Sequence, residues 1–398
     1  MGIIINQSAI TPDVARQLIS ICPFGAFDYK EETLSVTAAC KGCRLCVKRG
    51  PIGAISWEDE EKEAIDKSLW SSVCVLAEER DGKLHPVCAE LLGKARELAS
   101  VTNEPVAALV IGHKTEGLVL ELLSFGADKV FVYDEEELSE FKITPYANAF
   151  YDYIQKEKPS SILVGATNLG RSLAPKVAAR CRTGLTADCT RLEMKENGDL
   201  VQIRPAFGGN IMAQIISPDT RPQFCTVRYK IFSAPEKTAN PKGEVIRMEI
   251  SKELLASKTK ILSRKEKEKT LDISDAELIV ACGRGIKSEA DLSLAKELAE
   301  ELGATLACSR PLVESGWMDP RCQIGLSGRT VKPKLLIALG ISGSVQFAAG
   351  MNGSDKIVAI NSDPGASIFN IADVGLVGDL YEIVPMLIEK IKEGRANV

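Results

Sequence analysis

From about residue 70 onward, short apolar runs alternate with longer stretches whose apolar positions recur at the helical period. Such runs predict buried strands, and the stretches between them predict amphipathic helices. Strands that alternate with helices are typical of a parallel α/β sheet, because each helix carries the chain back across one face. In the first half of the chain the predicted strands are 71–80, 106–112, 128–134, 160–166 and 225–232.

The last of those strands closes a predicted α/β domain over residues 68–235. Within it, residues 201–216 have the pattern of two strands around a Gly-Gly turn, VQIRPAFGGNIMAQII. The stretch 168–181 begins with Asn-Leu-Gly-Arg-Ser at a strand-to-helix junction. Backbone amides at such a junction can hold a phosphate, but ordinary turn chemistry explains the same residues equally well. Both interpretations stay open.

The alternation returns over residues 271–398, for which we predict a doubly wound domain. Its strands are expected at 276–283, 304–309, 334–340, 356–361 and 372–378, and its helices at 288–303 and 380–393. Between the two α/β domains, residues 236–270 are turn-rich and then charged, with seven basic and three acidic side chains over 251–269. No aromatic residues interleave with those charges to stack on bases. We therefore predict a solvated linker and not a nucleic-acid site.

The first 62 residues follow a different pattern, in which cysteine spacing dominates. Cys40, Cys43 and Cys46 have the spacing C-x2-C-x2-C. Bacterial ferredoxins continue this run as C-x3-C-P, and the thiolates hold a [4Fe–4S] cluster. Here Pro51 is in place, but Gly50 stands where the fourth cysteine is expected.

An internal repeat supplies the missing ligand. When the sequence is aligned with itself so that Cys22 matches Gly50, PFGAF at 23–27 also matches PIGAI at 51–55. In two-cluster ferredoxins the fourth cysteine of each run binds the cluster of the other copy. The surviving cysteines therefore form one complementary set: Cys22, Cys40, Cys43 and Cys46. Residues 1–62 resemble a bacterial-type ferredoxin domain reduced to one [4Fe–4S] cluster.

A four-cysteine zinc site is the alternative for this set. Zinc ribbons usually use two C-x2-C pairs on separate turns, which this spacing does not provide. A cluster carries one electron, so we predict that the N-terminal domain is a port for electrons. The eight other cysteines are scattered singly, and we expect them to be buried small side chains.

Composition restricts the classes of partner. The 398 residues carry a net charge of −5 and the pI is about 5.5, which argues against nucleic acid or an anionic membrane surface as partner. No apolar run approaches the ~18–20 residues that span a bilayer, and we see no secretory signal. Twelve cysteines without such a signal suggest a reducing compartment. We expect a cytoplasmic protein.

In the C-terminal domain the chemically informative residues follow the predicted strands, where α/β domains bind their ligands. Gly-Arg-Gly at 283–285 follows the first strand, and Ser309 and Arg310 follow the second. Gly-Ile-Ser-Gly-Ser at 340–344 opens a helix whose amides suit a pyrophosphate. With residues 324–328 and 361–363 there are five such loops on one edge, two of them with arginines, which is much stronger evidence than one glycine-rich turn.

Taken together, these motifs resemble the FAD domain of electron-transfer flavoprotein α subunits. They are G-R-G (283–285), S-R-P-L-V-E-S-G-W (309–317), P-K-L-L-I-A-L-G-I-S-G-S-V-Q-F-A-A-G-M (333–351) and I-V-A-I-N-S-D-P-x-A-x-I-F (357–369). R-P-A-F-G-G-N at 204–210 is similar to the first domain of the same subunit. The resemblance therefore extends from about residue 70 to the C-terminus.

The resemblance implies one FAD in the C-terminal domain. Arg284 would lie over the flavin ring, where positive charge favours the reduced, anionic form. Residues 324–327 would lie beside the ring, residues 342–346 would hold the ribityl chain and phosphates, and the adenosine end would lie near Asn361. The implied FAD-binding residues are Arg284, Ser309, Arg310, Ile324, Gly325, Leu326, Ser327, Ser342, Gly343, Ser344, Val345, Gln346, Phe347, Asn361, Asp379 and Leu380.

Two positions depart from the family pattern. Phe347 stands where the family usually has a histidine that donates toward the flavin, and Gly325-Leu326-Ser327 replaces the usual Gly-Gln-Thr. Both changes remove polar side chains from around the ring. A one-electron couple changes its equilibrium tenfold for about 59 mV, so the loss of one hydrogen bond would matter unless backbone amides compensate.

The resemblance also implies a function and partners. Such α subunits pair with a smaller β subunit, and their FAD passes electrons to an FAD-dependent dehydrogenase. With a ferredoxin domain added, the chain is similar to the anaerobic members that bifurcate or confurcate electrons, whose β subunit carries a second FAD and the NAD site. We expect an electron-transfer subunit of an oxidoreductase complex without substrate chemistry of its own. External ferredoxin is expected to dock at the cluster.

Three points stay open in the sequence. The dehydrogenase would act on lactate or on an acyl-CoA, and we favour lactate. Arg204 would reach the second flavin or serve only as a salt-bridge residue. The alternatives to bifurcation are an ordinary carrier to a quinone-linked acceptor and an assembly subunit with a structural cluster.

Overall fold

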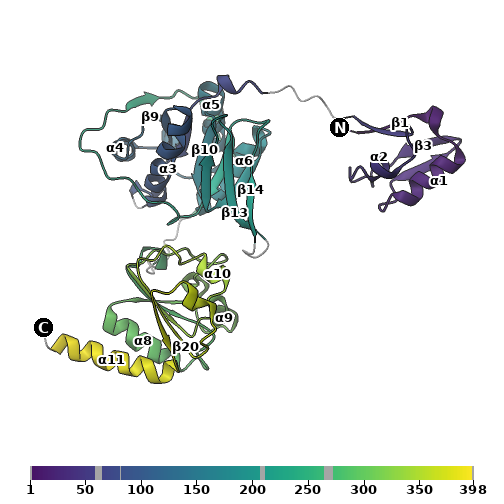
Figure 1. The fold of residues 1–398 in the computed structure, drawn as a ribbon. Coiled ribbons are helices and arrows are strands. Elements are labelled where there is room, and N and C mark those ends of the chain that lie inside the picture. The colour runs from purple at the N-terminus through teal and green to yellow at the C-terminus, as the bar shows by residue number, and fades with distance from the viewer. Residues whose placement is uncertain (1, 59–64, 81, 207–210, 264–271, 397–398) are drawn as a thin grey trace. The chain divides into compact units, whose positions relative to one another are not determined.

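The structure is a computed structural model, and it describes residues 2–58, 65–80, 82–206, 211–263 and 272–396. The chain divides into two compact units, Met1–Ala64 and Ile65–Val398, called unit 1 and unit 2 below (Figure 1). Each unit has its own buried core.

Unit 1 consists of two antiparallel strand pairs and two helices. β1 (Gly2–Ile5) pairs with β4 (Ile55–Glu58), and β2 (Phe27–Lys30) pairs with β3 (Thr33–Val36). α1 (Pro12–Ile21) is followed by Cys22, and α2 (Leu45–Arg49) is followed by Gly50. The two helices thus end at matching positions of the internal repeat. The buried core of unit 1 comprises Ala15, Leu18, Phe27, Leu34, Cys46, Ala54 and Ile55.

Unit 2 begins with a parallel sheet of seven strands in the order β11-β15-β10-β5-β8-β9-β16. The chain starts in the middle, at β5, and then adds strands on one side before it crosses to the other. The strands are β5 (Val73–Leu76), β8 (Val106–Gly112), β9 (Lys129–Asp134), β10 (Ser161–Gly165), β11 (Leu185–Cys189), β15 (Gln223–Val227) and β16 (Glu244–Arg247).

Helices cover both faces of this sheet (Figure 1). Alternate residues of β5 divide between two cores: Val73 and Val75 face α3 (Pro86–Thr102) and α4 (Glu116–Ser124), whereas Cys74 and Leu76 face α5 (Ile143–Glu157) and α6 (Asn168–Arg180). Because both faces are buried, the strands are apolar throughout, which is the reason they were visible in the sequence.

Three further pieces complete this part of the chain. β12 (Arg191–Met194), β13 (Leu200–Ala206) and β14 (Ile211–Ile215) form an antiparallel sheet. β6 (Glu79–Arg80) and β7 (Lys83–Leu84) form a short hairpin, and α7 (Lys252–Leu255) buries Leu255 against the α5 side of the core. The predicted Gly-Gly turn between β13 and β14 lies outside the described residues.

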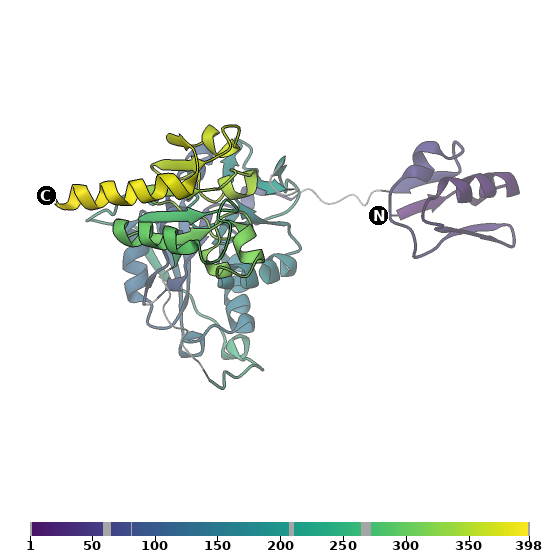
Figure 2. The same ribbon diagram turned by 90° about the horizontal axis from the view of Figure 1, so that it is seen from below.

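The second α/β domain of unit 2 has a five-stranded parallel sheet in the order β18-β17-β19-β20-β21. α8 and α11 lie side by side on one face (Figure 2), and α10 with several loops covers the other. The elements are β17 (Leu278–Cys282), α8 (Leu292–Leu302), β18 (Thr305–Cys308), α9 (Arg310–Glu314), β19 (Leu335–Leu339), α10 (Val345–Ala348), β20 (Ile357–Asn361), β21 (Val374–Val377) and α11 (Leu380–Ala396).

The structure corrects three sequence predictions. The strand expected at 71–80 ends at Leu76, and that expected at 225–232 ends at Val227, because the chain leaves the sheet at Arg228. The predicted linker 236–270 contains β16, which pairs with β9 as the outermost strand of the sheet. β16 was missed because its side chains are largely exposed, with Val245 43% exposed, so its sequence lacks the apolar run of a buried strand.

The single cysteines are mostly where they were expected. All twelve are free thiols. Among the eight outside unit 1, Cys181 and Cys322 are only partly buried, and the other six are buried.

Candidate functional site

Three glycines bring the carboxyl ends of β17 and β19 into close contact. A side chain at Gly285 would lie 2.6 Å from the Cα of Gly340, and one at Gly283 would lie 2.4 Å from the Gly340 carbonyl oxygen. The amide of Gly285 donates to that same oxygen over 2.9 Å. Only glycine permits this approach, which places Arg284 and the loop after β19 at one edge of the sheet.

The loop after β19 presents a run of amide donors. Gly343 has a φ of +83°, and a Cβ there would lie 2.2 Å from the amide nitrogen of Ile368, so the position requires glycine. The hydroxyl of Ser344 accepts a hydrogen bond from the amide of Phe347 and caps α10. Among the described residues, no backbone acceptor pairs with the amides of 342–345. Such amides at a helix start can bind an anion.

These loops enclose a cavity of about 560 Å³, called the edge cavity below. Twelve of the sixteen residues implied by the resemblance line it: Arg284, Ser309, Arg310, Ile324, Gly325, Leu326, Ser327, Ser342, Ser344, Gln346, Phe347 and Asn361. Eight further residues also line it: Gly285, Pro311, Glu314, Gln323, Gly340, Ile341, Asp363 and Ala366. Seven of these additions lie within the motifs quoted above, and the eighth, Gln323, is next to the predicted Ile324.

Four implied residues do not line the edge cavity. Gly343 and Val345 belong to the loop that borders it. Asp379 accepts a hydrogen bond from the amide of Tyr381 over 2.9 Å and starts α11. Leu380 is buried, and its side chain approaches Gly340. Asp379 and Leu380 therefore form the start of α11, and Leu380 packs against the edge of the sheet at Gly340.

Side chains around the edge cavity are fixed mainly by neighbouring loops. The Asn361 amide donates to the carbonyl of Ile341 over 2.8 Å and ties β20 to the loop after β19. The Gln323 amide donates to the hydroxyl of Ser327 over 2.8 Å. Arg310 is exposed and pairs with Glu314 at 2.7 Å. These bonds tie the loops of the edge cavity to one another, and Arg310 lies exposed beside them.

Phe347, where the resemblance expects histidine, is only 4% exposed. It packs in the core that includes Ile324 and Met351. An apolar ring satisfies this position, whereas a buried imidazole would need hydrogen-bond partners. The substitution is therefore consistent with the packing around it.

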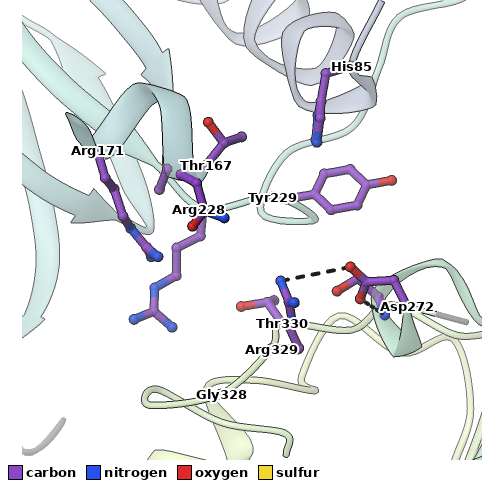
Figure 3. Close-up of a pocket in the computed structure, with 12 residues that line it drawn as sticks. His85, Thr167, Arg171, Arg228, Tyr229, Asp272, Gly328, Arg329 and Thr330 are labelled. Carbon is purple, nitrogen blue, oxygen red and sulfur yellow. Dashed lines mark hydrogen bonds and ion pairs between the residues drawn. The ribbon is translucent and has the colours of Figure 1, made fainter. Parts of the chain in front are cut away.

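A second cavity, of about 340 Å³, lies where the two α/β domains of unit 2 meet (Figure 3). Three arginines point into this region, Arg171, Arg228 and Arg329. Arg228 donates to the carbonyl of Leu326 over 2.6 Å and lies 3.2 Å from the Asp188 carboxylate, which also binds Arg171. The loop that lines the edge cavity is thus bonded to the first domain. No sequence pattern indicated this contact.

A buried carboxylate, Glu78, follows β5 and approaches Gly165 at the end of β10, and the order of strands reverses between β5 and β10. Glu78 is 5% exposed, and the hydroxyl of Thr167 donates to its Oε2 over 2.6 Å. Its Oε1 has no partner among the described residues. Burial raises the pKa of Glu78 to about 7, and the hydrogen bond from Thr167 lowers this pKa and so opposes the effect of burial. At the start of α6, the Thr167 hydroxyl also accepts from the amide of Gly170, which is ordinary capping, and the phosphate interpretation of this junction stays a prediction.

In unit 1, the four predicted cysteines surround one small space. Cys22, Cys40, Cys43 and Cys46 all line it, together with Ile3, Phe24, Ala26, Phe27, Lys41, Arg44 and Leu45. Cys46 is buried, which raises the pKa of its thiol, and the nearby Cys43 and Cys40 add to this shift. Cys43 is exposed. Among the described residues, no three His, Cys, Asp or Glu side chains converge closely enough to hold a single metal ion.

Gly50 could not carry the fourth thiol. A Cβ at this position would lie 2.2 Å from the carbonyl oxygen of Cys46 and 2.9 Å from the side chain of Leu18. A cysteine side chain at position 50 would therefore collide with α2 at Cys46 and with α1 at Leu18. Cys22, in contrast, lines the space and accepts a hydrogen bond from the amide of Ala26.

Arg204 lies in β13, paired with Ala213 of β14. It is half-buried, and its Nε donates to the carbonyl of the adjacent Pro205 over 3.4 Å. The structure shows no salt bridge for it among the described residues, so the role that the resemblance implies stays a prediction.

Comparison with known proteins assigns both α/β domains. A family model described as "Electron transfer flavoprotein domain" matches residues 73–253, and one described as "Electron transfer flavoprotein FAD-binding domain" matches residues 272–352. A chain from Thermoanaerobacterium thermosaccharolyticum, "Electron transfer flavoprotein subunit alpha", is 46% identical over 328 residues, which are 82% of this chain and 98% of that one. The chain belongs to the electron-transfer flavoprotein α-subunit family.

Two other members of the family are informative. "Lactate dehydrogenase (NAD(+),ferredoxin) subunit LctC" of Acetobacterium woodii is 60% identical over 396 residues, covering 100% of this chain and 94% of its own length. "Acryloyl-CoA reductase electron transfer subunit beta" of Anaerotignum propionicum is 39% identical over 359 residues, covering 83% of this chain and 98% of its own. Among solved structures, a thiamin diphosphate-dependent enzyme from Mycobacterium smegmatis aligns over 81% of this chain and 60% of its own, with 15% identity and a TM-score of 0.19, which carries no argument.

As an electron-transfer flavoprotein α subunit, the chain has an FAD-binding domain, and the edge cavity lies in it. The cavity's volume is within the ~300–1,000 Å³ usual for cofactor sites. Its amides suit a diphosphate, and its apolar residues suit a flavin ring. Among the described residues, no helix is both long and apolar enough to cross a membrane.

Proposed function

We propose that this chain is the α subunit of an electron-bifurcating or confurcating complex that connects NAD(H), ferredoxin and an FAD-dependent lactate dehydrogenase. The observation that carries the proposal is the presence, in one chain, of an FAD-binding domain and a space lined by four cysteines. The name of the Acetobacterium woodii relative, which covers the whole chain, supports lactate, NAD and ferredoxin as the reactants. The partner β subunit, carrying a second FAD and the NAD site, is inferred from the family.

The four cysteines suit a [4Fe–4S] cluster better than zinc. A zinc ribbon usually supplies two C-x2-C pairs from separate turns, whereas Cys40, Cys43 and Cys46 have the C-x2-C-x2-C spacing of a cluster-binding run. The irons of a cluster are spread over several corners, so its ligands surround it without converging. The space among the thiols is small, about 10 Å³, so the exposed loop with Cys40 and Cys43 would shift outward as a cluster assembles.

The residues of the edge cavity would hold FAD by three kinds of contact. The amides of 342–345 would donate to the diphosphate, and Arg284 and Arg310 would add positive charge. Ile324, Leu326 and Phe347 would keep water from the ring. When bound, FAD would accept and donate one or two electrons, and the cluster would accept and donate one.

The test uses the chain purified with its β subunit and dehydrogenase. Bifurcation predicts that NADH reduces ferredoxin only when the high-potential acceptor of the complex is present, and that lactate reduces NAD⁺ only when reduced ferredoxin is present. Ferredoxin that stays inert under all conditions would overturn the proposal in favour of an ordinary carrier. Acyl-CoA turnover in place of lactate turnover would reassign the dehydrogenase.

A further inference from the structure

The second cavity gathers positive charge from both α/β domains of unit 2 (Figure 3). Arg171 lies in the first turn of α6, and Arg228 directly follows β15, so both belong to the first domain. Arg329 lies in the loop before β19 of the second domain. All three line the cavity, which is called the arginine cavity below. A ligand held by these three side chains would therefore contact both domains.

The positive charge of these arginines is only partly neutralised. The Asp188 carboxylate pairs with Arg171 at 3.0 Å and with Arg228 at 3.2 Å. Arg329 Nη1 lies 3.8 Å from Asp272 Oδ2, a long distance for an ion pair. Three guanidinium groups therefore share two carboxylates, so this group of five side chains keeps one net positive charge. Because the side chain of Arg228 is only 15% exposed, water screens its charge less than that of a surface arginine.

The start of α6 lies beside the arginines. Thr167 and Asn168 line the arginine cavity, and they begin the junction whose sequence is compatible with phosphate binding. The first amides of a helix have no acceptor within the helix, so they are available as further donors. A helix start alone does not define a site. Here it borders a cavity that already carries an excess of positive charge.

Two aromatic rings line the same cavity and give it room for more than a single ion. His85 and Tyr229 are arranged edge to face, with 5.5 Å between their ring centres. The Tyr229 hydroxyl donates to Asp275 over 3.0 Å, which fixes the position of its ring. A volume of about 340 Å³ is within the range of small-molecule sites. A flat group attached to an anion can pack against these rings.

We infer that the arginine cavity binds a small phosphate-bearing molecule, which joins the two α/β domains of unit 2. A phosphate group has oxygens on several sides for three arginines, whereas a carboxylate has only two oxygens. A phosphate monoester carries a charge of about −1.5 to −2 near neutral pH and so neutralises the remaining positive charge. This site is separate from that of FAD, because the arginine cavity and the edge cavity share no lining residue.

The arginines have a second possible role, in which their pairs with Asp188 and Asp272 only hold the two domains together. In that case the cavity would have no preference for phosphate. Measuring phosphate binding in variants that remove charge from the cavity separates the two roles. The measurement does not depend on electron bifurcation, so its result is independent of the proposed function.

The experiment uses the complete chain with its β subunit and bound FAD. Arg171→Gln with Arg329→Gln is the test variant, because it removes two charges and leaves Arg228 in place. Arg180→Gln with Arg321→Gln is the matched control, with one change at the other end of α6 and one at an exposed arginine of the second domain. Calorimetry measures binding of inorganic phosphate, adenosine monophosphate and adenosine. Absorbance measures the FAD content of each variant.

We expect wild type and control to bind at least one of the two phosphate-bearing probes, and the test variant to bind it about tenfold or more weakly. Adenosine, which lacks phosphate, should bind at least tenfold more weakly than that probe in wild type. Tighter binding of the nucleotide would identify the rings as part of the site, and tighter binding of inorganic phosphate would restrict the site to the anion. Hydrogen–deuterium exchange of residues 167–171 and 328–330 should slow when the probe binds to wild type.

Two results would overturn the inference. One is that neither phosphate-bearing probe binds to wild type. The other is equal affinity in test and control variants, which would place the bound probe elsewhere in the complex. If the test variant loses FAD, Arg171→Gln alone repeats the comparison, because its side chain is half-exposed and lies outside the edge cavity.

Discussion

A Cβ placed on Gly50 would lie 2.2 Å from the carbonyl oxygen of Cys46. In the internal repeat Gly50 corresponds to Cys22, so a cysteine at this position could have been a ligand of a second cluster. The backbone of Cys46 leaves no space for that side chain. Gly50→Cys should therefore not create another iron site. We expect iron to stay at about four per chain.

The same variant should destabilise the protein by about 1–3 kcal/mol, because overpacking forces α2 away from Leu18. Thermal unfolding of the complete chain measures this cost. Gly2→Ala is the control, since nothing lies within 4 Å of a Cβ there. A melting temperature unchanged from wild type in Gly50→Cys would contradict the closed-site interpretation.

Cys22→Ser should remove the cluster as completely as Cys43→Ser, although the two cysteines lie in different copies of the repeat. Both thiols line the same space, and a hydroxyl is a poor substitute for a thiolate in iron–sulfur ligation. Iron and sulfide analysis with the visible spectrum provides the measurement. Cys181→Ser in unit 2 is the control, and an intact spectrum in Cys22→Ser would refute the fourth ligand.

Arg228→Ala should loosen the loop beside the edge cavity. The guanidinium donates to the Leu326 carbonyl over 2.6 Å and is paired with Asp188, and such charged hydrogen bonds contribute about 1.5–3 kcal/mol. Faster hydrogen–deuterium exchange of residues 324–328 is the expected result. Arg321→Ala, which removes an exposed arginine paired with Asp319, should leave this exchange unchanged. Unaltered exchange in Arg228→Ala would show that the loop is held without it.

Glu78 should make the protein less stable as pH rises. Burial raises its pKa from 4.5 to about 7 in the folded chain, so the folded state keeps a proton that the unfolded state releases. The stabilising contribution of the protonated Glu78 is complete below pH 4.5, decreases between pH 4.5 and about 7, and is lost above about pH 7. Glu90, whose pKa burial also raises to about 7, adds to the same window.

Glu78→Gln should consequently stabilise the chain at pH 8 by on the order of 2–3 kcal/mol and change little at pH 4. Urea unfolding at several pH values measures the difference. Glu79→Gln, at the exposed neighbour, should keep the wild-type slope. A Glu78→Gln curve parallel to wild type would mean that the carboxyl is not protonated near pH 7.

Much of the fold could be read from local patterns, and the exceptions have a physical cause. β5 and β8 were recognisable because residues on both of their faces are buried. β16 was not, because an exposed edge strand has little apolar sequence to reveal it. Asp363 lies within a quoted motif although it was not among the implied binding residues, whereas Asp188 and Arg228 had no signal.

The sequence by itself indicated most buried strands and helices and grouped the four cysteines, because periodicity and spacing are local properties of the chain. Most residues of the edge cavity were implied by the resemblance of their motifs to the family. Only the tertiary structure decided that Gly50 is closed by Cys46 and that Arg228 binds Leu326, 98 positions away. Such contacts depend on how separate elements pack, and close packing between remote segments leaves no periodic trace in the sequence.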